Sequence, residues 1–576
     1  MKLKVLQTLV VIIGIIFLSQ CSDIKKIEVL TNNPSQYQKV EMDIYLKAEW
    51  ENPNDAEEIS LDMIVHSPSG NEQKVPCFYF TGESGEKSQW KVRYTPAEVG
   101  EYRYHFVLSQ KNETNVETKA ANFSVNESDG KGILHVNDLW TLRYDNGELF
   151  RGIGENICWE SRDFDDSKYF QKLHEESKFN YEYMIRKLAA NGGNFFRTWM
   201  IYWNLPVDWK MVKNNQRYTN SETLYNDSGT RKMDRLVELC DSLNVHIMVA
   251  LESHAGMMGQ GWELNSYNIK NGGTAITQEE FFTLESAKKQ YKNKLRYMVA
   301  RYGYSPAIGA WEFFNEIDNV MYNRGEEFFI KDEIITQWHD EMSTYLKEID
   351  PYEHIVTTSV SHREVAGMYA LKNIDINQRH IYRQTDKIPN LIKDGAEKYD
   401  KPFVIGEFGY EWDWSKNFND FAEDMDGDFK KGLWYGLFNP TPILPMSWWW
   451  EFFEDRDIMS YFKNVKEISD EMLVSGNGEF QQITIESNQK SLTIFGVQCG
   501  EKIYTYIISQ DDNEKSVDLI YPGYNSLISG LQYFDCETGN YHPVKDENLS
   551  GNSLKMQDEE LPLKTGVVLI ISLKQE

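Results

Sequence analysis

Trp-Glu-Phe-Phe-Asn-Glu, at residues 311–316, is the stretch that decides how this chain folds. Ile308, Gly309 and Ala310 precede it, so an apolar and aromatic run ends abruptly in a polar Asn-Glu pair. Such a run predicts a buried strand that delivers a carboxyl group to the rim of a sheet. A second segment, residues 402–407, ends in the same way at Glu407. The two segments together predict two glutamates at one edge of one sheet.

Strands and amphipathic helices alternate from about residue 133 to residue 473. Apolar residues at helical spacing, such as Met184, Ile185 and Leu188, mark helices between the strands. The expected strands are residues 149–156, 194–200, 246–251, 307–316, 355–359, 377–382, 403–407 and 443–449. Eight strands in this alternation predict a (β/α)₈ TIM barrel, in which functional side chains lie at the C-terminal ends of the strands.

Short alternating strands separated by turns flank the barrel region on both sides. They predict an N-terminal β-sandwich over residues 39–128 and a C-terminal β-sandwich over residues 475–576. Residues 94–102 resemble the immunoglobulin-like modules that precede the barrels of many bacterial glycoside hydrolases. The predicted fold is therefore multidomain, a TIM barrel between two sandwiches.

The N-terminus has the pattern of an export signal. Lys2 and Lys4 precede the apolar residues 9–18, a run too short to span a bilayer comfortably. Cys21 follows, and the segment resembles the cleavage box of bacterial lipoproteins of the Bacteroides type. The resemblance implies a signal peptide over residues 1–20, a lipidated Cys21, a polar tether over residues 21–38 and a lipid-anchored location in the cell envelope. An ordinary signal peptide with an incidental cysteine is the alternative.

Charge and composition exclude several classes of partner. The formal net charge of −29 repels phosphate backbones, so nucleic acid is not expected to bind. Residues 424–428 have calcium-loop character, but the glycine falls one place early and no glutamate closes the loop in register. No glycine-rich phosphate cradle follows any expected strand. We therefore expect neither a metal nor another cofactor, and we expect the cysteines other than Cys21 to be buried free thiols.

Polar residues stand at the ends of six expected strands. They are Arg197, His254, the pair Asn315 and Glu316, the pair His380 and Tyr382, Glu407 and Trp449. This ordered set closely resembles the clan-A retaining glycoside hydrolases, particularly their cellulase-like branch, and the resemblance covers most of the barrel. Many members have proline after the Asn-Glu pair, whereas Ile317 follows here, which leaves the subfamily in doubt but not the mechanism.

The resemblance implies a role for each of these residues. Glu316 is expected to be the general acid/base and Glu407 the nucleophile of a retaining, double-displacement reaction. Arg197 and Tyr382 would keep Glu407 ionised through hydrogen bonds. The remaining residues would bind the sugar: Asn315 its 2-hydroxyl, His254 and His380 other hydroxyls, and Trp449 its flat face.

Each assignment has an alternative in the sequence. Arg197 might be needed only to neutralise Glu312, which shares an inward face with Glu316 by strand alternation. His254 is as compatible with a structural role, and Trp448 is the main rival of Trp449. Four further tryptophans in expected barrel-mouth loops could form sugar subsites or simply pack: Trp203, Trp262, Trp412 and Trp414.

The sequence as a whole predicts a retaining β-glycoside hydrolase that acts on a polysaccharide or oligosaccharide. Its alternative is a non-catalytic glycan-binding surface lipoprotein on a barrel scaffold, which should have lost a glutamate or Arg197, and neither is lost. Transglycosylation would use the same residues. The identity of the sugar and the choice between endo and exo action do not follow from the sequence.

Overall fold

The structure is a computed structural model that describes residues 23–161, 176–213, 216–322, 329–511, 514–524, 530–545, 548–557 and 561–573. Cys21 and the predicted signal peptide lie outside the described residues. The chain divides into two compact units. One comprises residues 1–132 with 289–305 and 345–353, and the other comprises residues 133–288, 306–344 and 354–576.

The N-terminal strands form two antiparallel sheets, as expected for a sandwich. One sheet has the order β1-β2-β6-β5, and the other has the order β4-β3-β7-β8 with β9 also paired to β7. Their inward residues, such as Ile44, Met63 and Phe106, are fully buried. The bounds are β1 (Ile24–Val29), β2 (Val40–Lys47), β3 (Ile59–His66), β4 (Glu72–Pro76), β5 (Phe78–Thr81), β6 (Lys87–Tyr94), β7 (Gly100–Gln110), β8 (Val116–Glu117) and β9 (Ala121–Val125).

Strand β1 corrects the expected tether over residues 21–38. Ile24 to Val29 pair antiparallel with β2 along its edge, and Ile24 is fully buried. Lysines and a glutamate interrupt the apolar residues of this short strand, so it reads as a polar segment in the sequence. Charged side chains of this kind are common on edge strands, where they oppose pairing with another chain.

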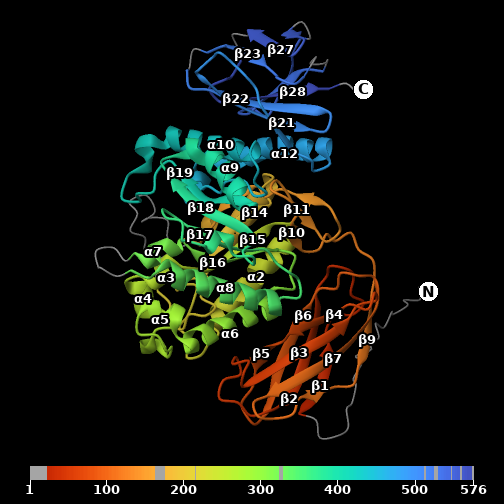
Figure 1. Cartoon of the computed structure of the whole chain (residues 1–576). Coiled ribbons are helices and arrows are strands. Elements are labelled where there is room, and N and C mark those ends of the chain that lie inside the picture. The colour runs from red at the N-terminus through yellow and green to blue at the C-terminus, as the bar shows by residue number, and fades with distance from the viewer. Residues whose placement is uncertain are drawn as a thin grey trace, which may run out of the picture. The chain divides into compact units, whose positions relative to one another are not determined.

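The central sheet of the second unit is parallel and carries the predicted barrel strands in sequence order. Seven strands pair in the order β13-β14-β15-β16-β17-β18-β19 (Figure 1). Their bounds are β13 (Gly154–Asn156), β14 (Phe195–Trp199), β15 (His246–Ser253), β16 (Ile308–Asn315), β17 (Val356–Val360), β18 (Ile376–Tyr382) and β19 (Phe403–Gly409). Nearly every residue of these strands is buried, which explains their continuous apolar runs.

The expected eighth strand, residues 443–449, closes the barrel without forming a regular strand. Gly152 bridges Ile443 and Glu155 bridges Ser447 on one side, while Phe408 bridges Ser447 on the other. Backbone hydrogen bonds from Met446 and Trp448 to β19 complete the seam. The segment is therefore held between the first and seventh strands, as a TIM barrel requires.

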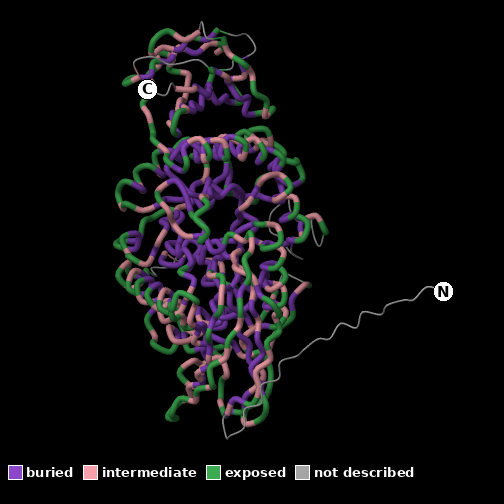
Figure 2. The backbone as a smooth tube through the Cα atoms, turned by 90° about the vertical axis from the view of Figure 1, so that its right-hand side faces the viewer, coloured by how far each residue is buried: buried purple, intermediate pink, exposed green. Residues whose placement is uncertain are grey.

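Helices connect these strands on the outside of the barrel (Figure 1). Their apolar stripes face the sheet, as Met233, Leu236 and Val237 of α2 do. The α-helices are α1 (Tyr181–Ala190), α2 (Asp227–Leu243), α3 (His254–Met257), α4 (Gln260–Leu264), α5 (Gln278–Thr283), α6 (Glu285–Tyr302), α7 (Ile317–Met321), α8 (Asp332–Ile349), α9 (Ile388–Tyr399), α10 (Ala422–Leu437), α11 (Trp450–Asp455) and α12 (Phe462–Gly476). In Figure 2 the inner stretches of the backbone are mostly purple, the colour of buried residues, and the outer stretches are mostly green.

A small antiparallel sheet packs into one end of the barrel. It consists of β10 (Leu134–Val136), β11 (Leu142–Tyr144) and β12 (Leu149–Phe150). Leu142 and Phe150 pack there with Met248, Val404 and Ile443 from barrel positions. The expected first barrel strand, residues 149–156, is therefore wrong in its first half, because Leu149 and Phe150 belong to this small sheet, whereas Gly152 and Gly154–Asn156 pair within the barrel.

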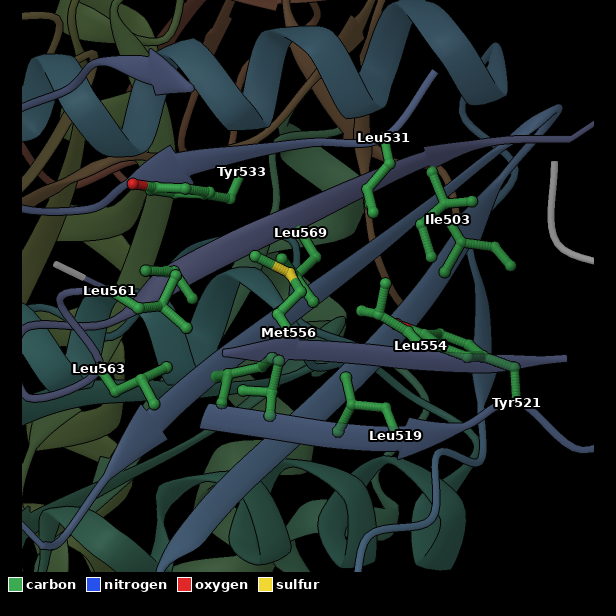
Figure 3. Close-up of a cluster of buried hydrophobic side chains, with 14 residues drawn as sticks. Ile503, Leu519, Tyr521, Leu531, Tyr533, Leu554, Met556, Leu561, Leu563 and Leu569 are labelled. Atoms are coloured by element: carbon green, nitrogen blue, oxygen red, sulfur yellow. The ribbon is translucent and has the colours of Figure 1, made fainter. Parts of the chain in front are cut away.

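The C-terminal region forms a second sandwich with its own core (Figure 3). A sheet of order β20-β21-β22-β28-β24-β25 faces a sheet of order β23-β27-β26. Leu519 and Met556 from the small sheet meet Ile503 and Leu569 from the large one. The bounds are β20 (Gln481–Ile483), β21 (Leu492–Cys499), β22 (Lys502–Ser509), β23 (Ser516–Ile520), β24 (Gln532–Asp535), β25 (Tyr541–Pro543), β26 (Leu549–Ser550), β27 (Ser553–Gln557) and β28 (Val567–Ser572).

Two further properties concern the whole described chain. Within the described ranges, helices are all too short or too polar to cross a bilayer. The five cysteines in these ranges are buried free thiols: Cys77, Cys158, Cys240, Cys499 and Cys536.

Candidate active site

The two strand-end glutamates meet at the C-terminal mouth of the barrel. Glu316 follows the last residue of β16, and Glu407 lies near the end of β19. One carboxylate oxygen of each lies within 4.8 Å of the other, and both lie within 4.8 Å of a ring nitrogen of His380. Carboxyl groups about 5–5.5 Å apart are typical of retaining glycosidases, whereas inverting enzymes need about 6.5–9.5 Å. The spacing therefore matches the retaining geometry.

Arg197, in the middle of β14, links the two sides of this mouth. Its Nη1 donates a hydrogen bond to Glu407 Oε1 at 2.8 Å. Nε and Nη2 donate to Glu312 Oε2 and Oε1 at 2.6 and 2.8 Å. Nη2 also donates to Asn315 Oδ1 at 2.5 Å. The guanidinium is fully buried, yet its pKa is raised because the paired carboxylates outweigh the effect of burial. Arg197 thus neutralises Glu312 and also binds Glu407, so the alternative in which it serves Glu312 alone does not hold in the geometry.

Glu407 receives a second strong hydrogen bond from β18. The Tyr382 hydroxyl donates to Glu407 Oε2 at 2.6 Å. Burial and the neighbouring carboxylates raise the pKa of Tyr382 far above its usual range, so the phenol keeps its proton to donate. His380 Nδ1 lies 3.4 Å from the same oxygen. Each oxygen of Glu407 therefore faces a donor, which favours its ionised form.

Glu316 has a different environment and an unusual backbone. Its φ of 53° lies in the left-handed region, which is rare for a residue with a side chain and is found where the surroundings impose it. Ser359 Oγ accepts from its backbone N–H at 3.0 Å. The carboxyl oxygens lie 2.9 Å from His380 Nδ1, 2.8 Å from Asn319 Nδ2 and 3.5 Å from His254 Nδ1. The side chain is thereby aimed into the mouth from the turn between β16 and α7.

Burial is the largest influence on both glutamates, and it raises the pKa of both carboxyl groups. At Glu407, His380, Arg197 and the Tyr382 hydroxyl oppose this rise, while the charge of Glu316 adds to it. At Glu316, His254 and Arg197 oppose the rise, while the carboxylate of Asp318 adds to it. A pair that shares a small space releases its protons in two steps, and the hydrogen bonds from Arg197 and Tyr382 suit Glu407 to the ionised role.

Both histidines of the site are uncharged at neutral pH. Burial lowers the pKa of His380 to about 4 and also lowers that of His254. Neutral His380 can donate one proton from Nδ1, which faces the two glutamates. His254 lies directly after β15, because that strand extends two residues further than expected, to Ser253. Its Nδ1 lies 3.0 Å from Asn315 Nδ2, so the structure brings His254 to the site.

Two tryptophans, Trp448 and Trp449, stand at the end of the eighth segment. Trp449 has a left-handed backbone, with φ of 68°, and donates from Nε1 to the Glu411 backbone oxygen at 2.6 Å. Trp448 packs 5.4 Å from Trp199, whose ring lies 6.0 Å from that of His254. Trp449 is the residue directly before helix α11 and does not lie in a regular strand. The alternation of side chains along a strand therefore does not determine where its side chain points. Its role as the sugar platform stays a prediction.

Several residues of the site escaped the sequence reasoning. Asn156 Oδ1 accepts from Arg197 at 3.2 Å, and its Nδ2 donates to backbone oxygens of Gly406, Met446 and Ser447. Asn319 contacts Glu316. Asn156 ends a barrel strand, and that position was the signal that could have identified it. Asn319 lies on the short helix α7, which has no comparable signature.

The same cluster has the geometry of a metal site in outline. Glu316, His380 and Glu407 bring three ligand atoms together. Glu407 already accepts from Arg197 and Tyr382, and a divalent cation placed there would be repelled by the buried guanidinium. The contacts suit a proton shared between carboxylates better than a metal ion. The acidic run at residues 424–428 lies inside helix α10 and is not a loop.

Comparison with known proteins agrees with the fold. Residues 163–425 match the family model "Cellulase (glycosyl hydrolase family 5)", and residues 33–109 match a domain of unknown function, DUF5060. A structure of a presumed glycoside hydrolase from Bacteroides vulgatus ATCC 8482 has the same fold, with a TM-score of 0.62 and 14% identity over 94% of this chain and 100% of that one.

Curated relatives match parts of the chain. "Probable mannan endo-1,4-beta-mannosidase C" of Aspergillus terreus is 36% identical over 128 residues, which are 22% of this chain and 30% of that protein. "Mannan endo-1,4-beta-mannosidase A" of Podospora anserina is 26% identical over 247 residues, 37% of this chain and 62% of that protein. The chain thus spans less than two thirds of the length of these relatives. Residues 163–425 are therefore similar to the cellulases of glycosyl hydrolase family 5.

Proposed function

We propose that the protein is a retaining β-glycoside hydrolase that cleaves a β-linked polysaccharide by double displacement. The observation that carries the proposal is the short spacing of Glu316 and Glu407, within 4.8 Å, at the mouth of the barrel. Glu407 attacks the anomeric carbon as Glu316 protonates the departing oxygen, which gives a covalent glycosyl-enzyme. Glu316 then takes a proton from water, and the water oxygen attacks the anomeric carbon and displaces the carboxylate of Glu407, so the sugar leaves with its original configuration.

The neighbouring residues support these two roles. Arg197 and Tyr382 hold Glu407 ionised and oriented before the attack. Nδ1 of neutral His380 lies 2.9 Å from Glu316 and 3.4 Å from Glu407. It can therefore donate a hydrogen bond to whichever of the two carboxyl groups carries the negative charge. Asn315, fixed by Arg197, is assigned to the 2-hydroxyl, where hydrogen bonds strengthen in the transition state. His254 is assigned to a neighbouring hydroxyl and Trp449 to the sugar face.

We propose β-1,4-mannan as the substrate class. Both curated relatives named above carry the description of mannan endo-1,4-beta-mannosidases, the first of them as probable. The formal net charge of −29 also favours a neutral glycan over a polyanionic one.

A panel of β-mannan, β-glucan, xylan and galactan tests the proposal. We expect new reducing ends from β-mannan, and the first product should have the β configuration by NMR. The Glu407→Ala protein serves as the control for contaminating activity. An α-configured first product would overturn the retaining mechanism, and release from another glycan alone would overturn the assignment to mannan.

The alternative is a protein that binds glycan without cleaving it. The intact pair of glutamates, the Arg197 network and the family match all support turnover over binding alone. Retarded migration of the protein in gels that contain β-mannan, without reducing-end release from any member of the panel, would favour the alternative.

We also propose that Cys21 carries a lipid and anchors the protein in the cell envelope. The support is the sequence pattern alone: two lysines, an apolar run and a cysteine after small and polar residues.

Mass spectrometry of the mature N-terminus should find an acylated Cys21. Cys21→Ala should lose both the acylation and membrane attachment, while Ser22→Ala keeps them. A Cys21→Ala protein that is processed normally and remains membrane-bound would contradict the anchor.

A further inference from the structure

The tryptophans in the barrel-mouth loops differ sharply in exposure. Trp203 and Trp262 are only 5% and 6% exposed, so they pack within the protein. Trp412 and Trp414 are 43% and 40% exposed, more than any other tryptophan in the described ranges. Their rings lie 6.4 Å apart in an edge-to-face arrangement. Two exposed indoles on one loop are costly to keep in water and indicate a binding surface.

This loop is tied directly to the catalytic machinery. It begins after Gly409, the end of the strand that carries Glu407. Tyr382 donates to Glu407, and the next residue, Arg383, lies over the Trp412 ring with its guanidinium carbon 5.2 Å from the centroid. Trp412 is the fifth residue after Glu407, which limits the distance between their Cα atoms to about 17 Å. A few sugar units starting at the cleavage point can cover that distance.

The loop is also held rigid in its exposed position. The buried carboxylate of Glu411 accepts from the backbone N–H groups of Trp412 at 2.9 Å and Asp413 at 3.0 Å. Arg383 and Lys416 donate to the same carboxylate. The backbone oxygen of Glu411 accepts from the Trp449 indole, so the loop and that tryptophan are joined. A surface that is ordered before binding loses little entropy when a ligand settles on it.

We propose that Trp412 and Trp414 form a sugar-binding platform that extends the cleavage site along a glycan chain. Indole faces pack on the apolar C–H faces of pyranose rings, and Arg383 and Asp413 lie beside them to bind hydroxyls. The occupant is a neutral β-linked glycan chain that also lies across Glu316 and Glu407. This inference rests on the proposed function and deepens it, because it makes a chain, rather than a terminal disaccharide, the preferred substrate.

The test compares substrates of increasing length in Trp412→Ala, Trp414→Ala and the double variant. The loss in kcat/KM should grow with chain length, from an aryl β-mannobioside through β-1,4-mannohexaose to β-mannan. Each ring should account for about two- to thirteenfold on the polymer, since an aromatic contact contributes roughly 0.5–1.5 kcal/mol. Tyr183→Ala removes a ring that is 45% exposed on α1 and should match the wild type on every substrate.

Equal losses on the shortest and longest substrates would refute the platform, and so would wild-type values for the double variant. A binding measurement separates this inference from the catalytic proposal. In the Glu407→Ala protein, β-1,4-mannohexaose should change the tryptophan fluorescence and bind at least about tenfold more weakly after removal of both rings. If the wild type cleaves nothing but this difference persists, the catalytic proposal fails and the platform stands. If cleavage occurs without the difference, only the platform fails.

Discussion

Glu407→Ala should reduce turnover of β-glycosides by roughly 10⁴-fold or more, because no covalent glycosyl-enzyme can form without the nucleophile. The barrel should tolerate the change, since Arg197 keeps its bidentate contact with Glu312. Steady-state kinetics on an aryl β-glycoside and on β-mannan would measure the loss. Glu397→Ala, on the exposed surface of α9, is the matched control and should behave as the wild type.

Azide gives this experiment a second outcome that a merely damaged protein would not produce. A small anion can enter the space that the carboxylate leaves and attack the anomeric carbon from the same side. We expect partial recovery on an activated aryl glycoside, with the α-glycosyl azide as product. Wild-type activity in Glu407→Ala would show that the nucleophile is another group.

Glu316→Ala should affect substrates according to their leaving groups. Loss of a general acid costs about 10²–10⁴-fold where the departing oxygen needs a proton. A dinitrophenolate needs none, so the first step on such a glycoside should remain fast and appear as a burst, followed by slow release of the sugar. Pre-steady-state kinetics would resolve the two phases. Equal losses on aryl and natural glycosides would contradict the acid/base assignment.

The pH profile provides a further check on Glu316. Burial and Asp318 raise its pKa, so the acid form should persist above the usual range for glutamate, and the rate should fall as pH rises through this raised value. The acid limb belongs to protonation of Glu407 at lower pH. In Glu316→Ala, the alkaline limb should disappear from the first step of the aryl glycoside reaction.

The barrel and most of its site can be predicted from the sequence, because the strands of a parallel barrel have a regular sequence pattern. Its strands are buried on both faces, so they read as apolar runs, and the first polar residue after each run falls at the functional rim. That reasoning located Arg197, Glu316 and Glu407, which the structure brings together. Their catalytic roles remain predictions until the variants are measured.

Elements without that regularity were misjudged. The strand β1 has a charged, edge-strand sequence, and residues 149–156 contain two short strands of different sheets separated by a few residues. Trp203 and Trp412 look equivalent in the sequence, but one is buried and the other exposed. Such differences depend on which distant segments cover a loop, and a single sequence does not encode them in any local pattern.

The small sheet β10-β11-β12, which packs into one end of the barrel, has a consequence for synthesis of the chain. Leu142 and Phe150 complete their packing only when Ile443 and Met446 arrive, roughly 300 residues later, or about 15–60 s at a ribosomal rate of about 5–20 residues per second. During that interval the apolar side chains of β10-β11-β12 lack some of the barrel residues against which they finally pack. Contacts of such long range slow folding and favour aggregation of the incomplete chain. The end of the barrel that contains this sheet is therefore completed last, although its first residues are made early. In nascent chains, the apolar side chains of the sheet need protection from aggregation until the final barrel segment emerges.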